Sequence, residues 1–375
     1  MIPFNKPYLT GKETAYINET LNSRHFSGNG IFTKKCQAYF EQHYGFKKAL
    51  LTTSCTDALE MCAMLADINQ GDEVIMPSFT FVSTPLAFVR QGAKIVFVDS
   101  RSDNPNIDAD KIEALVTKKT KAIVVVHYAG VACDMDKIMT LAKKHNLLVI
   151  EDAAQSIDSY YKGKPLGSIG HLAAFSFHET KNITSGEGGL LAINDERFIN
   201  RSEIIWEKGT NRAEFYRGKI NKYGWVDTGS SFLPAEMVAA FLWAQLESLE
   251  DIQTKRKKIW ERYYSVLKSR SEKKGIRIFD VPDYATQNGH MFYLVCKNVE
   301  QRTSLMKHLK ENNIDTVFHY LSLHLSQYYK DKHDGRALPY SDLYTDCLVR
   351  LPMFNELTIQ EVDFITSKIM EAPLK

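Results

Sequence analysis

The stretch KAIVVVHYAGVACDMDKIMTLAKKHNLLVIED (residues 121–152) indicates the fold class. Two apolar, β-branched runs, KAIVVVH (121–127) and LLVIED (147–152), flank a segment whose apolar residues recur at helical spacing. Asp134 precedes this segment and Asn146 follows it, and these residue types begin and end helices. Because both runs are apolar at successive positions, the stretch predicts two parallel strands, covered on both faces and joined by a helix.

The same alternation of strands and helices extends in both directions along the chain. Five further runs predict strands of the same sheet: KALLTT (48–53), DEVIMP (72–77), KIVFVD (94–99), AAFSF (173–177) and GLLAIN (189–194). Beyond them come two helical stretches, 196–208 and 235–268, and then a mixture of the strand HMFYLVCK (290–297) with amphipathic helices. We therefore expect an α/β protein, with a large domain around a mostly parallel sheet over residues 1–245 and a small α+β domain over residues 246–375.

The composition excludes several classes of protein. The chain has 47 Lys and Arg against 45 Asp and Glu, a net charge of +2, so nucleic acid is not expected as a partner. The longest nearly apolar run covers residues 122–133, shorter than the roughly 20 residues that a membrane span needs. The first residues, MIPFNKPYLTGKE, lack the apolar core of a signal peptide. We expect a cytoplasmic protein that has no membrane partner.

The six cysteines are scattered and form no CxxC pair. This spacing predicts neither a disulfide framework nor a zinc site, and no metal is expected. A single nucleophilic cysteine stays possible, but ordinary buried thiols are the favoured interpretation.

Candidate chemistry lies where the predicted strands end, because ligands of open parallel sheets bind at the carboxyl ends of the strands. Asp152 closes LLVIED, Lys181 follows AAFSF, and the turn TTSCTDAL (52–59) follows the first strand. Each has an ordinary explanation when taken alone. Asp152 could cap a helix, Lys181 could be a solvated surface charge, and many helices begin as this turn does, with Thr56 and Asp57 able to cap it.

Together, these three features fit pyridoxal 5'-phosphate. This cofactor needs a lysine amine for a Schiff base, a carboxylate opposite the pyridine nitrogen, a cradle for its phosphate and an aromatic face against its ring. Phe81 is a candidate for the aromatic face, with a core phenylalanine as the alternative. The glycines of SGEGG (185–189) would let the backbone pass close to the site. The chain has no P-loop motif and no complete GxGxxG after a strand, so nucleotide-binding motifs do not compete.

The strings SCTDAL, EDAAQ, SFHETKN and GEGG, in this order and spacing, resemble the DegT/StrS-type sugar-nucleotide aminotransferases. The resemblance covers nearly the whole chain and implies the type I, aspartate aminotransferase-like fold of pyridoxal-phosphate-dependent transferases. The longer strings VHYAGVACDMD, FSFHETKN, EKGTNR and HMFY are similar to the WecE-type subgroup, whose members are dTDP-4-amino-4,6-dideoxygalactose transaminases.

Carried over to this sequence, the resemblance implies roles around the cofactor ring. Lys181 would form the Schiff base and then move the proton during catalysis. Asp152 would pair with the pyridinium nitrogen, and Gln155 would approach the ring hydroxyl. Phe81 would stack on the ring.

The resemblance also implies contacts to the phosphate and to the substrate. Thr56, the backbone of Asp57 and Ser176 would hold the phosphate. His319, in VFHYLSLH, would close over the substrate side. Many relatives have an asparagine that reaches the phosphate of the neighbouring subunit, but Leu233 stands at the matching place here, so that contact is not predicted.

The activity implied is transfer of an amino group from L-glutamate to a dTDP-4-keto-6-deoxyhexose. The product would be a dTDP-4-amino-4,6-dideoxyhexose, with the galacto form favoured, for a surface polysaccharide such as lipopolysaccharide or common antigen. The family implies a homodimer with a shared active site. The segments SGNGIF (27–32) and KGTNRAEF (208–215) are candidates for setting the pose of the sugar.

Several alternatives stay open at this stage. A 3-keto or other nucleotide-sugar aminotransferase of the same family is the alternative that no single residue excludes. A dehydratase is disfavoured because that version has histidine in place of Lys181. A non-catalytic binding or regulatory protein would have been marked by loss of Lys181 or Asp152, and both are present. Only the α/β pattern favours a nicotinamide dehydrogenase.

Overall fold

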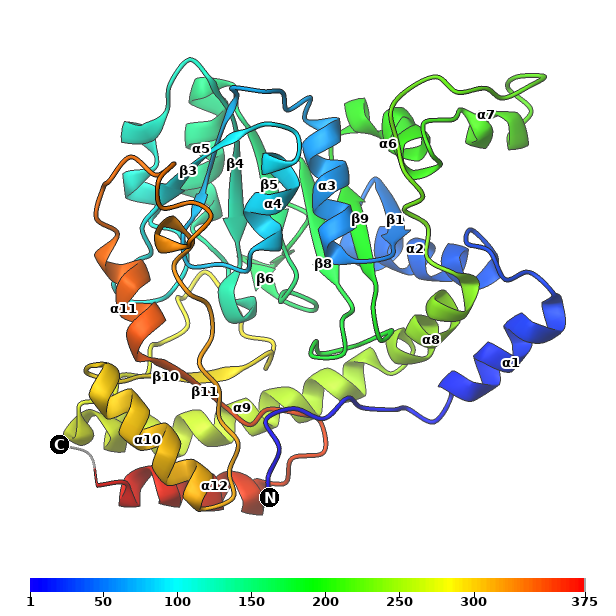
Figure 1. The fold of residues 1–375 in the computed structure, drawn as a ribbon. Helices are drawn as coiled ribbons and strands as arrows, with labels where there is room; N and C mark the ends of the chain where they lie inside the picture. Colours follow the sequence, from blue (N-terminus) through cyan, green and yellow to red (C-terminus); the bar gives the residue numbers. More distant parts are fainter. Residues whose placement is uncertain (374–375) are drawn as a thin grey trace.

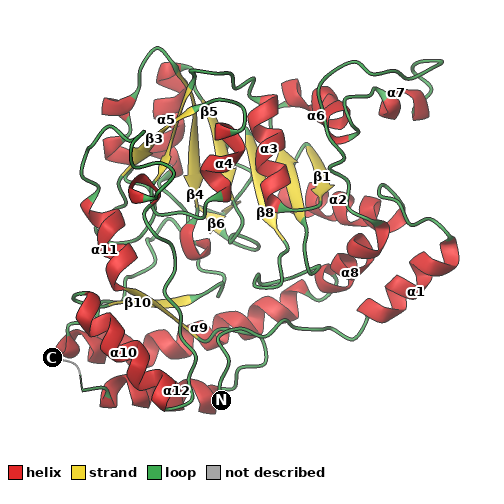
Figure 2. Ribbon diagram, viewed as in Figure 1, coloured by secondary structure: helices red, strands yellow, loops and turns green. Residues whose placement is uncertain are grey.

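Seven strands form the central sheet of the computed structural model, which describes residues 1–373. Their order in the sheet is β1-β9-β8-β5-β4-β2-β3 (Figures 1 and 2). The strands are β1 (Lys48–Thr52), β2 (Glu73–Pro77), β3 (Lys94–Val98), β4 (Thr120–Val126), β5 (Leu148–Asp152), β8 (Leu172–Ser176) and β9 (Gly189–Ile193). All seven were predicted, and each boundary falls within one residue of the expectation.

One strand departs from the parallel arrangement. β9 pairs antiparallel with both of its neighbours, β1 and β8, whereas the remaining strand pairs are parallel. Residues 177–188, which connect β8 to β9, contain no helix, so the chain returns beside β8 instead of crossing over the sheet. The segment that carries Lys181 is therefore a loop at the carboxyl end of β8.

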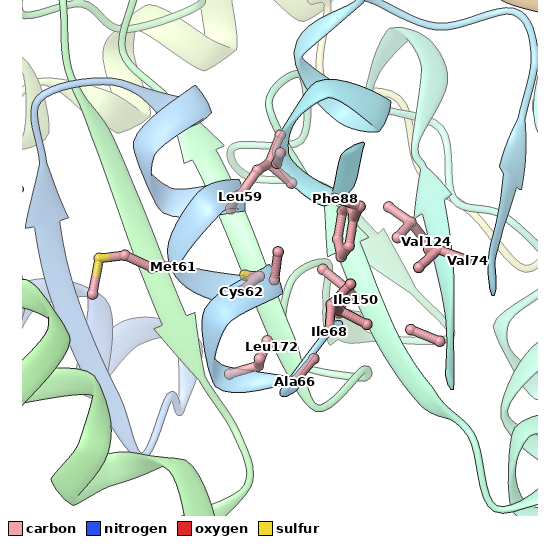
Figure 3. Packing of buried hydrophobic residues seen from close by; sticks show 14 of the residues in the cluster. Leu59, Met61, Cys62, Ala66, Ile68, Val74, Phe88, Val124, Ile150 and Leu172 are labelled. Atoms are coloured by element: carbon pink, nitrogen blue, oxygen red, sulfur yellow. The ribbon is translucent and has the colours of Figure 1, made fainter. Parts of the chain in front are cut away.

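One face of the sheet is covered by α3 (Cys55–Leu65) and α4 (Ser83–Val89). Figure 3 shows this packing: Cys62 and Phe88 lie against strand side chains such as Val124. Fully burying an apolar side chain of this size stabilises a fold by about 1.5–3 kcal/mol. This layer fixes the start of α3, and hence the TTSCTDAL turn, at the edge of the sheet.

The opposite face is covered by α2 (Ile31–Tyr44), α5 (Met135–His145) and α8 (Glu236–Leu246). Strand residues alternate between the two layers: Val124 contacts the α3 side, and its neighbours Ile123 and Val125 contact the α5 side. Apolar residues are needed at every position because both faces are covered.

Helix α9 (Leu249–Ser271) links the sheet domain to a smaller C-terminal unit (Figure 1). The helical stretch expected over 235–268 forms two helices, because the helical conformation is interrupted at residues 247–248, between α8 and α9. Ile252 packs in the core beneath α2 and α8, whereas Tyr263 and Leu267 pack in the core of the C-terminal unit.

The C-terminal unit contains an antiparallel pair of strands and three helices. These are β10 (Phe292–Val295), β11 (Leu348–Leu351), α10 (Val299–Glu311), α11 (Pro339–Cys347) and α12 (Ile359–Glu371). The first residues of the chain also join it: Ile2 forms a β-bridge with Ile314, and the Met353 N–H donates to the Phe4 carbonyl over 3.2 Å. The domain division at residue 245 stays a prediction from the sequence.

Five α-helices and strands of the described residues remain, and one of these helices packs Ile205 and Trp206 into the core beside α3. They are α1 (Glu13–Ser23), α6 (Ile199–Trp206), α7 (Arg212–Tyr216), β6 (Tyr160–Tyr161) and β7 (Lys164–Pro165). Within residues 1–373, each helix is too short or too polar to cross a membrane.

Candidate active site

A cavity of about 980 Å³ lies where the carboxyl ends of the sheet strands face the C-terminal unit. The eight site residues predicted from the sequence all line this cavity: Thr56, Asp57, Phe81, Asp152, Gln155, Ser176, Lys181 and His319. They come from five separate segments of the chain, so the fold brings them together. The structure gives their positions, and their roles stay proposals.

The Asp152 carboxylate, at the end of β5, is buried and held by two hydrogen bonds. Its Oδ2 accepts from the Thr84 hydroxyl over 2.7 Å, and its Oδ1 accepts from the Ala154 N–H over 3.2 Å. Burial raises the pKa of Asp152 above its ordinary value. An oriented carboxylate in a buried site is suited to pairing with a positively charged ring nitrogen.

The Lys181 amine enters the cavity from the loop that follows β8. The backbone N–H of Lys181 donates to the His178 carbonyl over 2.9 Å, and this bond closes a turn in the loop. Burial lowers the pKa of Lys181 below its ordinary value. A lysine whose neutral form is favoured in this way is a better nucleophile and base than an exposed one.

The residue after Lys181 fixes this loop in place. Asn182 is buried, and its Nδ2 donates to Gln253 Oε1 and to the Asn288 carbonyl, each over 2.8 Å. A further 2.8 Å hydrogen bond joins Asn182 Oδ1 to His290 Nδ1. Gln253 lies on α9, and His290 lies just before β10. The loop that carries Lys181 is therefore hydrogen-bonded both to the linking helix and to the C-terminal unit.

The turn between β1 and α3 is built around Ser54. The Ser54 hydroxyl accepts from the Asp57 N–H over 3.1 Å, so Ser54 caps the helix, and the expectation that Thr56 and Asp57 do so is wrong. The helix begins at Cys55, which places both of those residues inside its first turn. The Thr56 hydroxyl donates to Ser83 Oγ over 2.8 Å and keeps its acceptor capacity.

The start of α3 can hold an anion, since the first N–H groups of a helix have no partner within it. The Asp57 N–H, proposed as one contact to a phosphate, already has a partner in Ser54. Gly189 lets β9 pass directly beside this turn: a Cβ at that position would lie 2.4 Å from the Ser54 carbonyl carbon.

Three other predicted residues contribute a polar or aromatic surface. The Ala129 N–H donates to Gln155 Oε1 over 2.6 Å, and Gln155 Nε2 donates to the Tyr320 hydroxyl over 2.9 Å. The Ser176 hydroxyl accepts from the His178 N–H over 3.4 Å. Phe81 is 56% exposed at the cavity, so the alternative of a core phenylalanine is wrong.

The C-terminal unit contributes a compact aromatic group. A hydrogen bond of 2.7 Å joins His319 Nδ1 to the Tyr128 hydroxyl, and the imidazole stacks on Tyr320 with ring centres 3.5 Å apart. Burial lowers the pKa of His319 well below its ordinary value, so this imidazole is neutral at physiological pH. It offers hydrogen bonding without adding charge.

Several residues that line the cavity were not predicted from the sequence, among them His178, His290 and Arg350. His178 falls in SFHETKN and His290 in HMFY, both quoted for the resemblance, whereas Arg350 lies outside the quoted strings. Nothing in the local pattern distinguishes His290 and Arg350. Their position depends on the pairing of β10 with β11.

The two segments suggested for sugar recognition lie elsewhere in the single chain. Within residues 1–373, neither 27–32 nor 208–215 lines this cavity. The Gly30 N–H donates to Glu236 Oε2 over 3.0 Å, which anchors the start of α2 on α8. Residues 208–215 include most of α7, which projects away from the sheet (Figure 1).

The residues present fit pyridoxal phosphate. The cavity offers a buried, oriented carboxylate, a half-buried lysine, an exposed aromatic ring and the beginning of a helix that can hold a phosphate. Each comes from a different strand end, as the binding of a flat ring at the edge of the sheet requires.

Comparisons with known proteins agree with this geometry. The family described as the DegT/DnrJ/EryC1/StrS aminotransferase family matches residues 7–370. The chain is 32% identical over 374 residues to GDP-perosamine synthase of Escherichia coli O157:H7, which covers 99% of this chain and 98% of the relative. It is 31% identical over 382 residues to the spore coat polysaccharide biosynthesis protein SpsC of Bacillus subtilis, covering 99% and 96% of the two chains.

Solved structures show the same fold. A Streptococcus pneumoniae protein described as a sugar aminotransferase, Spr1654, solved in its PLP form, superposes with a TM-score of 0.90 at 26% identity. The match covers 99% of this chain and 98% of that structure.

Proposed function

The chain belongs to the DegT/DnrJ/EryC1/StrS aminotransferase family, and we propose that it transfers the amino group of L-glutamate to a dTDP-4-keto-6-deoxyhexose. Its class, a sugar aminotransferase that uses pyridoxal phosphate, follows from the family and its relatives. The nucleotide, the 4-keto position and the galacto product are the proposed part. The strings VHYAGVACDMD, FSFHETKN, EKGTNR and HMFY, similar to the WecE-type subgroup, support it.

One observation carries the assignment of the site. The buried carboxylate of Asp152 and the half-buried side chain of Lys181 line a single cavity at the carboxyl edge of the sheet. We infer that Lys181 attaches the cofactor and that Asp152 pairs with its ring nitrogen. Phe81 would cover one face of the ring, and Thr56 and Ser176 would contact the phosphate.

When bound, the cofactor acts as an electron sink for negative charge that develops on the substrate carbon. Lys181 Nζ, once released from the cofactor, would take the proton from the carbon that bears the donor nitrogen and return it to the neighbouring position. Asp152 Oδ2, oriented by the Thr84 hydroxyl, would keep the ring nitrogen protonated. His319, on the substrate side, would contribute a neutral hydrogen-bonding group.

The first test separates the activity from its specificity. Purified protein loaded with cofactor and given L-glutamate should convert the cofactor to its amine form, as read from its absorbance spectrum. The Lys181→Ala variant is the control. The full reaction should follow ping-pong kinetics, with parallel lines in double-reciprocal plots.

The second test addresses the sugar nucleotide. We expect the amine form to react faster with dTDP-4-keto-6-deoxyglucose than with a GDP-linked 4-keto-6-deoxy sugar. The comparison is needed because one relative is named for a GDP-linked product. Mass and NMR analysis of the product give the ring position and the orientation of the amine. Faster reaction with the GDP-linked sugar, or with a 3-keto sugar, would replace the proposed specificity.

The product would serve the synthesis of a surface polysaccharide, and one relative is named for such a pathway. We also propose a homodimer, as the family resemblance implies. Large apolar side chains are exposed beside the cavity: Phe81 is 56%, Val82 49% and Leu321 63% exposed. Patches of this kind mark protein interfaces. Light scattering during size-exclusion chromatography should give twice the chain mass, and a monomer mass would refute the dimer.

A further inference from the structure

His290 is a buried imidazole at the active-site cavity that the roles proposed so far do not use. It lies just before β10, is 8% exposed and lines the same cavity as Lys181. Its backbone is held on both sides, because its N–H donates to Asn288 Oδ1 and its carbonyl accepts from Arg256 Nη2, each over 2.9 Å. The ring is therefore carried by a fixed segment of the chain.

The side chain of Asn182 determines which nitrogen of this ring carries the proton. Asn182 Nδ2 faces two carbonyl oxygens, those of the Gln253 side chain and the Asn288 backbone, each at 2.8 Å, so it donates to both. The reverse orientation of the amide would set oxygen against oxygen. Asn182 Oδ1 is then an acceptor, and its 2.8 Å hydrogen bond to His290 Nδ1 requires a proton on Nδ1.

The other ring nitrogen, Nε2, is an unused acceptor. Burial, and then the positive charges of Lys181, Arg256 and Arg350, lower the pKa of His290 well below its ordinary value, so the ring is neutral. A neutral imidazole with its proton on Nδ1 has a free lone pair on Nε2. Within residues 1–373 this nitrogen has no hydrogen-bond partner, and the ring lines the cavity, so a group in the cavity can use the lone pair.

Three histidines line the cavity in the described part of the chain, and they offer different groups. His178 Nδ1 accepts from the Thr180 N–H over 3.2 Å, so its neutral form presents a donor at Nε2. His319 bonds to the Tyr128 hydroxyl, which can donate or accept, so the position of its proton is not fixed. Of the three, only His290 is fixed as an acceptor.

We propose that His290 is a positioning residue whose Nε2 accepts a hydrogen bond from the Lys181 amine while that amine moves the proton. The inference rests on the proposed aminotransferase function. Asn182 directly follows Lys181, so its bond to His290 brings the imidazole beside the loop that carries the amine. In residues 1–373 as they stand, the amine hydrogen-bonds to no side chain, and its flexible stem lets it turn toward an acceptor.

A neutral acceptor suits this task better than a carboxylate. Lys181 Nζ can take a proton only through its lone pair, and holding one of its N–H groups fixes the direction of that lone pair. A carboxylate at the same place would favour the ammonium form, which has no lone pair. The imidazole of His290 orients the amine without that negative charge, and its own proton stays on Nδ1 throughout.

Two variants separate the two ring nitrogens. In His290→Asn, the amide reaches the place of Nδ1, so the bond to Asn182 is kept and the acceptor at Nε2 is lost. In His290→Gln, the amide reaches the place of Nε2, so an acceptor is kept and the bond to Asn182 is lost.

The first measurement is the half-reaction of L-glutamate with the cofactor-loaded protein. His290→Asn should lower its maximal rate about tenfold, the upper range for loss of one hydrogen bond. His290→Gln should recover most of this rate. The L-glutamate concentration at half-maximal rate should keep its wild-type value in both variants, because the contact is made to Lys181 and not to the donor.

A deuterium isotope effect shows whether proton transfer is the step affected. With L-glutamate deuterated at the carbon that bears the amine, the isotope effect on this half-reaction should be larger in His290→Asn than in wild type, because proton transfer then limits the rate more. A general loss of stability or of cofactor would not raise it. The control is His43→Asn: His43 also hydrogen-bonds through Nδ1, to the Tyr39 carbonyl, but it is exposed and lies outside the cavity lining.

The rate at which cofactor-free protein takes up pyridoxal phosphate gives a readout that needs no turnover. A hydrogen bond to Nε2 favours the charged form of Lys181, so its loss in His290→Asn should move the pH profile of uptake to lower pH. If wild type does not convert the cofactor with glutamate, the proposed function fails, and this profile still decides whether His290 contacts Lys181.

Three results would overturn the proposal. A rise in the half-saturating concentration of L-glutamate or of the sugar nucleotide, at an unchanged maximal rate, would assign His290 to that substrate. An equal loss of rate in His290→Asn and His290→Gln would show that the imidazole is needed for packing. An unchanged rate and an unchanged uptake profile in His290→Asn would leave His290 with a structural role.

If His290→Asn does not fold, Asn182→Asp takes its place. The carboxylate beside Nδ1 would raise the pKa of His290, and below that pKa Nε2 carries a proton and cannot accept. The rate of the half-reaction should therefore be lost as the pH falls, at a higher pH than in wild type. An acid limb at the wild-type pH would contradict the proposal.

Discussion

The two walls of the cavity differ in how their polar groups are paired. On the sheet side, Asp152 accepts from Thr84 and Ala154, and Ser54 accepts from the Asp57 N–H. On the side of the C-terminal unit, Arg350 has a buried N–H group without a partner. The sheet wall is therefore organised before any ligand arrives. On the opposite wall His319 and Tyr320 are also hydrogen-bonded, but the Arg350 Nε–H is a donor that a ligand could complete. We infer that the first wall is built for the cofactor and the second for the substrate.

The largest effect is expected from removing Lys181, which lies on the sheet side of the cavity. Lys181→Ala should lower turnover about 10⁴-fold, the upper range for loss of a general acid–base group. Exposed Lys307→Ala is the control and should keep wild-type turnover. Borohydride reduction followed by peptide mapping should place the cofactor on Lys181, and a label on another lysine would contradict the assignment.

Removing the charge of the sheet wall should have the next largest effect. Asp152→Asn keeps the shape but no longer holds the ring nitrogen protonated, so turnover should fall about 100-fold or more, a loss typical of removing one electrostatic contact to the transition state. Cofactor affinity, measured by titration of the absorbance, should weaken as well. The control is Asp136→Asn, because Asp136 is an exposed carboxylate that pairs with Lys162 on the surface. Wild-type turnover in Asp152→Asn would remove the basis for placing the ring against this residue.

A smaller effect is expected from the residue that orients the carboxylate. Thr84→Val removes the 2.7 Å hydrogen bond to Asp152 Oδ2 and should reduce turnover about tenfold, as loss of one hydrogen bond to a charged group does. Because that bond also lowers the pKa of Asp152, its loss should shift the acid limb of the pH–rate profile upward. The control, Thr303→Val on the exposed side of α10, should leave the profile unchanged.

The pH dependence of cofactor attachment should give the smallest and most specific effect. Burial lowers the pKa of Lys181, so its neutral, reactive amine predominates at a lower pH than in an exposed lysine. The rate at which cofactor-free protein takes up pyridoxal phosphate should rise with pH and level off below about 10.4, the ordinary pKa of lysine. A rate that is still rising at that pH would show that Lys181 is not perturbed.

The strands of the sheet were predictable because the signal is local. Buried parallel strands need apolar residues at successive positions. The first and last residues of runs such as KAIVVVH and LLVIED therefore predict where the strands begin and end. The direction of β9 was not predictable in this way, because GLLAIN reads the same in a parallel or an antiparallel strand. It was decided by the connection from β8, which has no crossover helix.

The residues of the candidate site also differ in whether the local sequence predicts them. Asp152 ends one predicted strand and Lys181 follows another, so the topology alone brings them to one edge of the sheet. Arg350 sits on a four-residue strand of the C-terminal unit, and its sequence context says nothing about a cavity. Its position follows from contacts between distant segments, including the pairing of β11 with β10 and the packing on Phe4. The cap at Ser54 was missed because helix limits shift easily by one or two residues.

The pairing of Ile2 with Ile314 has a practical consequence for work with this protein. Phe4 and Asn5 line the cavity, so a peptide fused ahead of residue 1 would emerge close to the reacting groups. Affinity handles are therefore better placed at the other terminus. A fragment cut at residue 246 would also lose the segment that pairs with residues 313–315 and 353, so the C-terminal unit is best studied within the intact polypeptide.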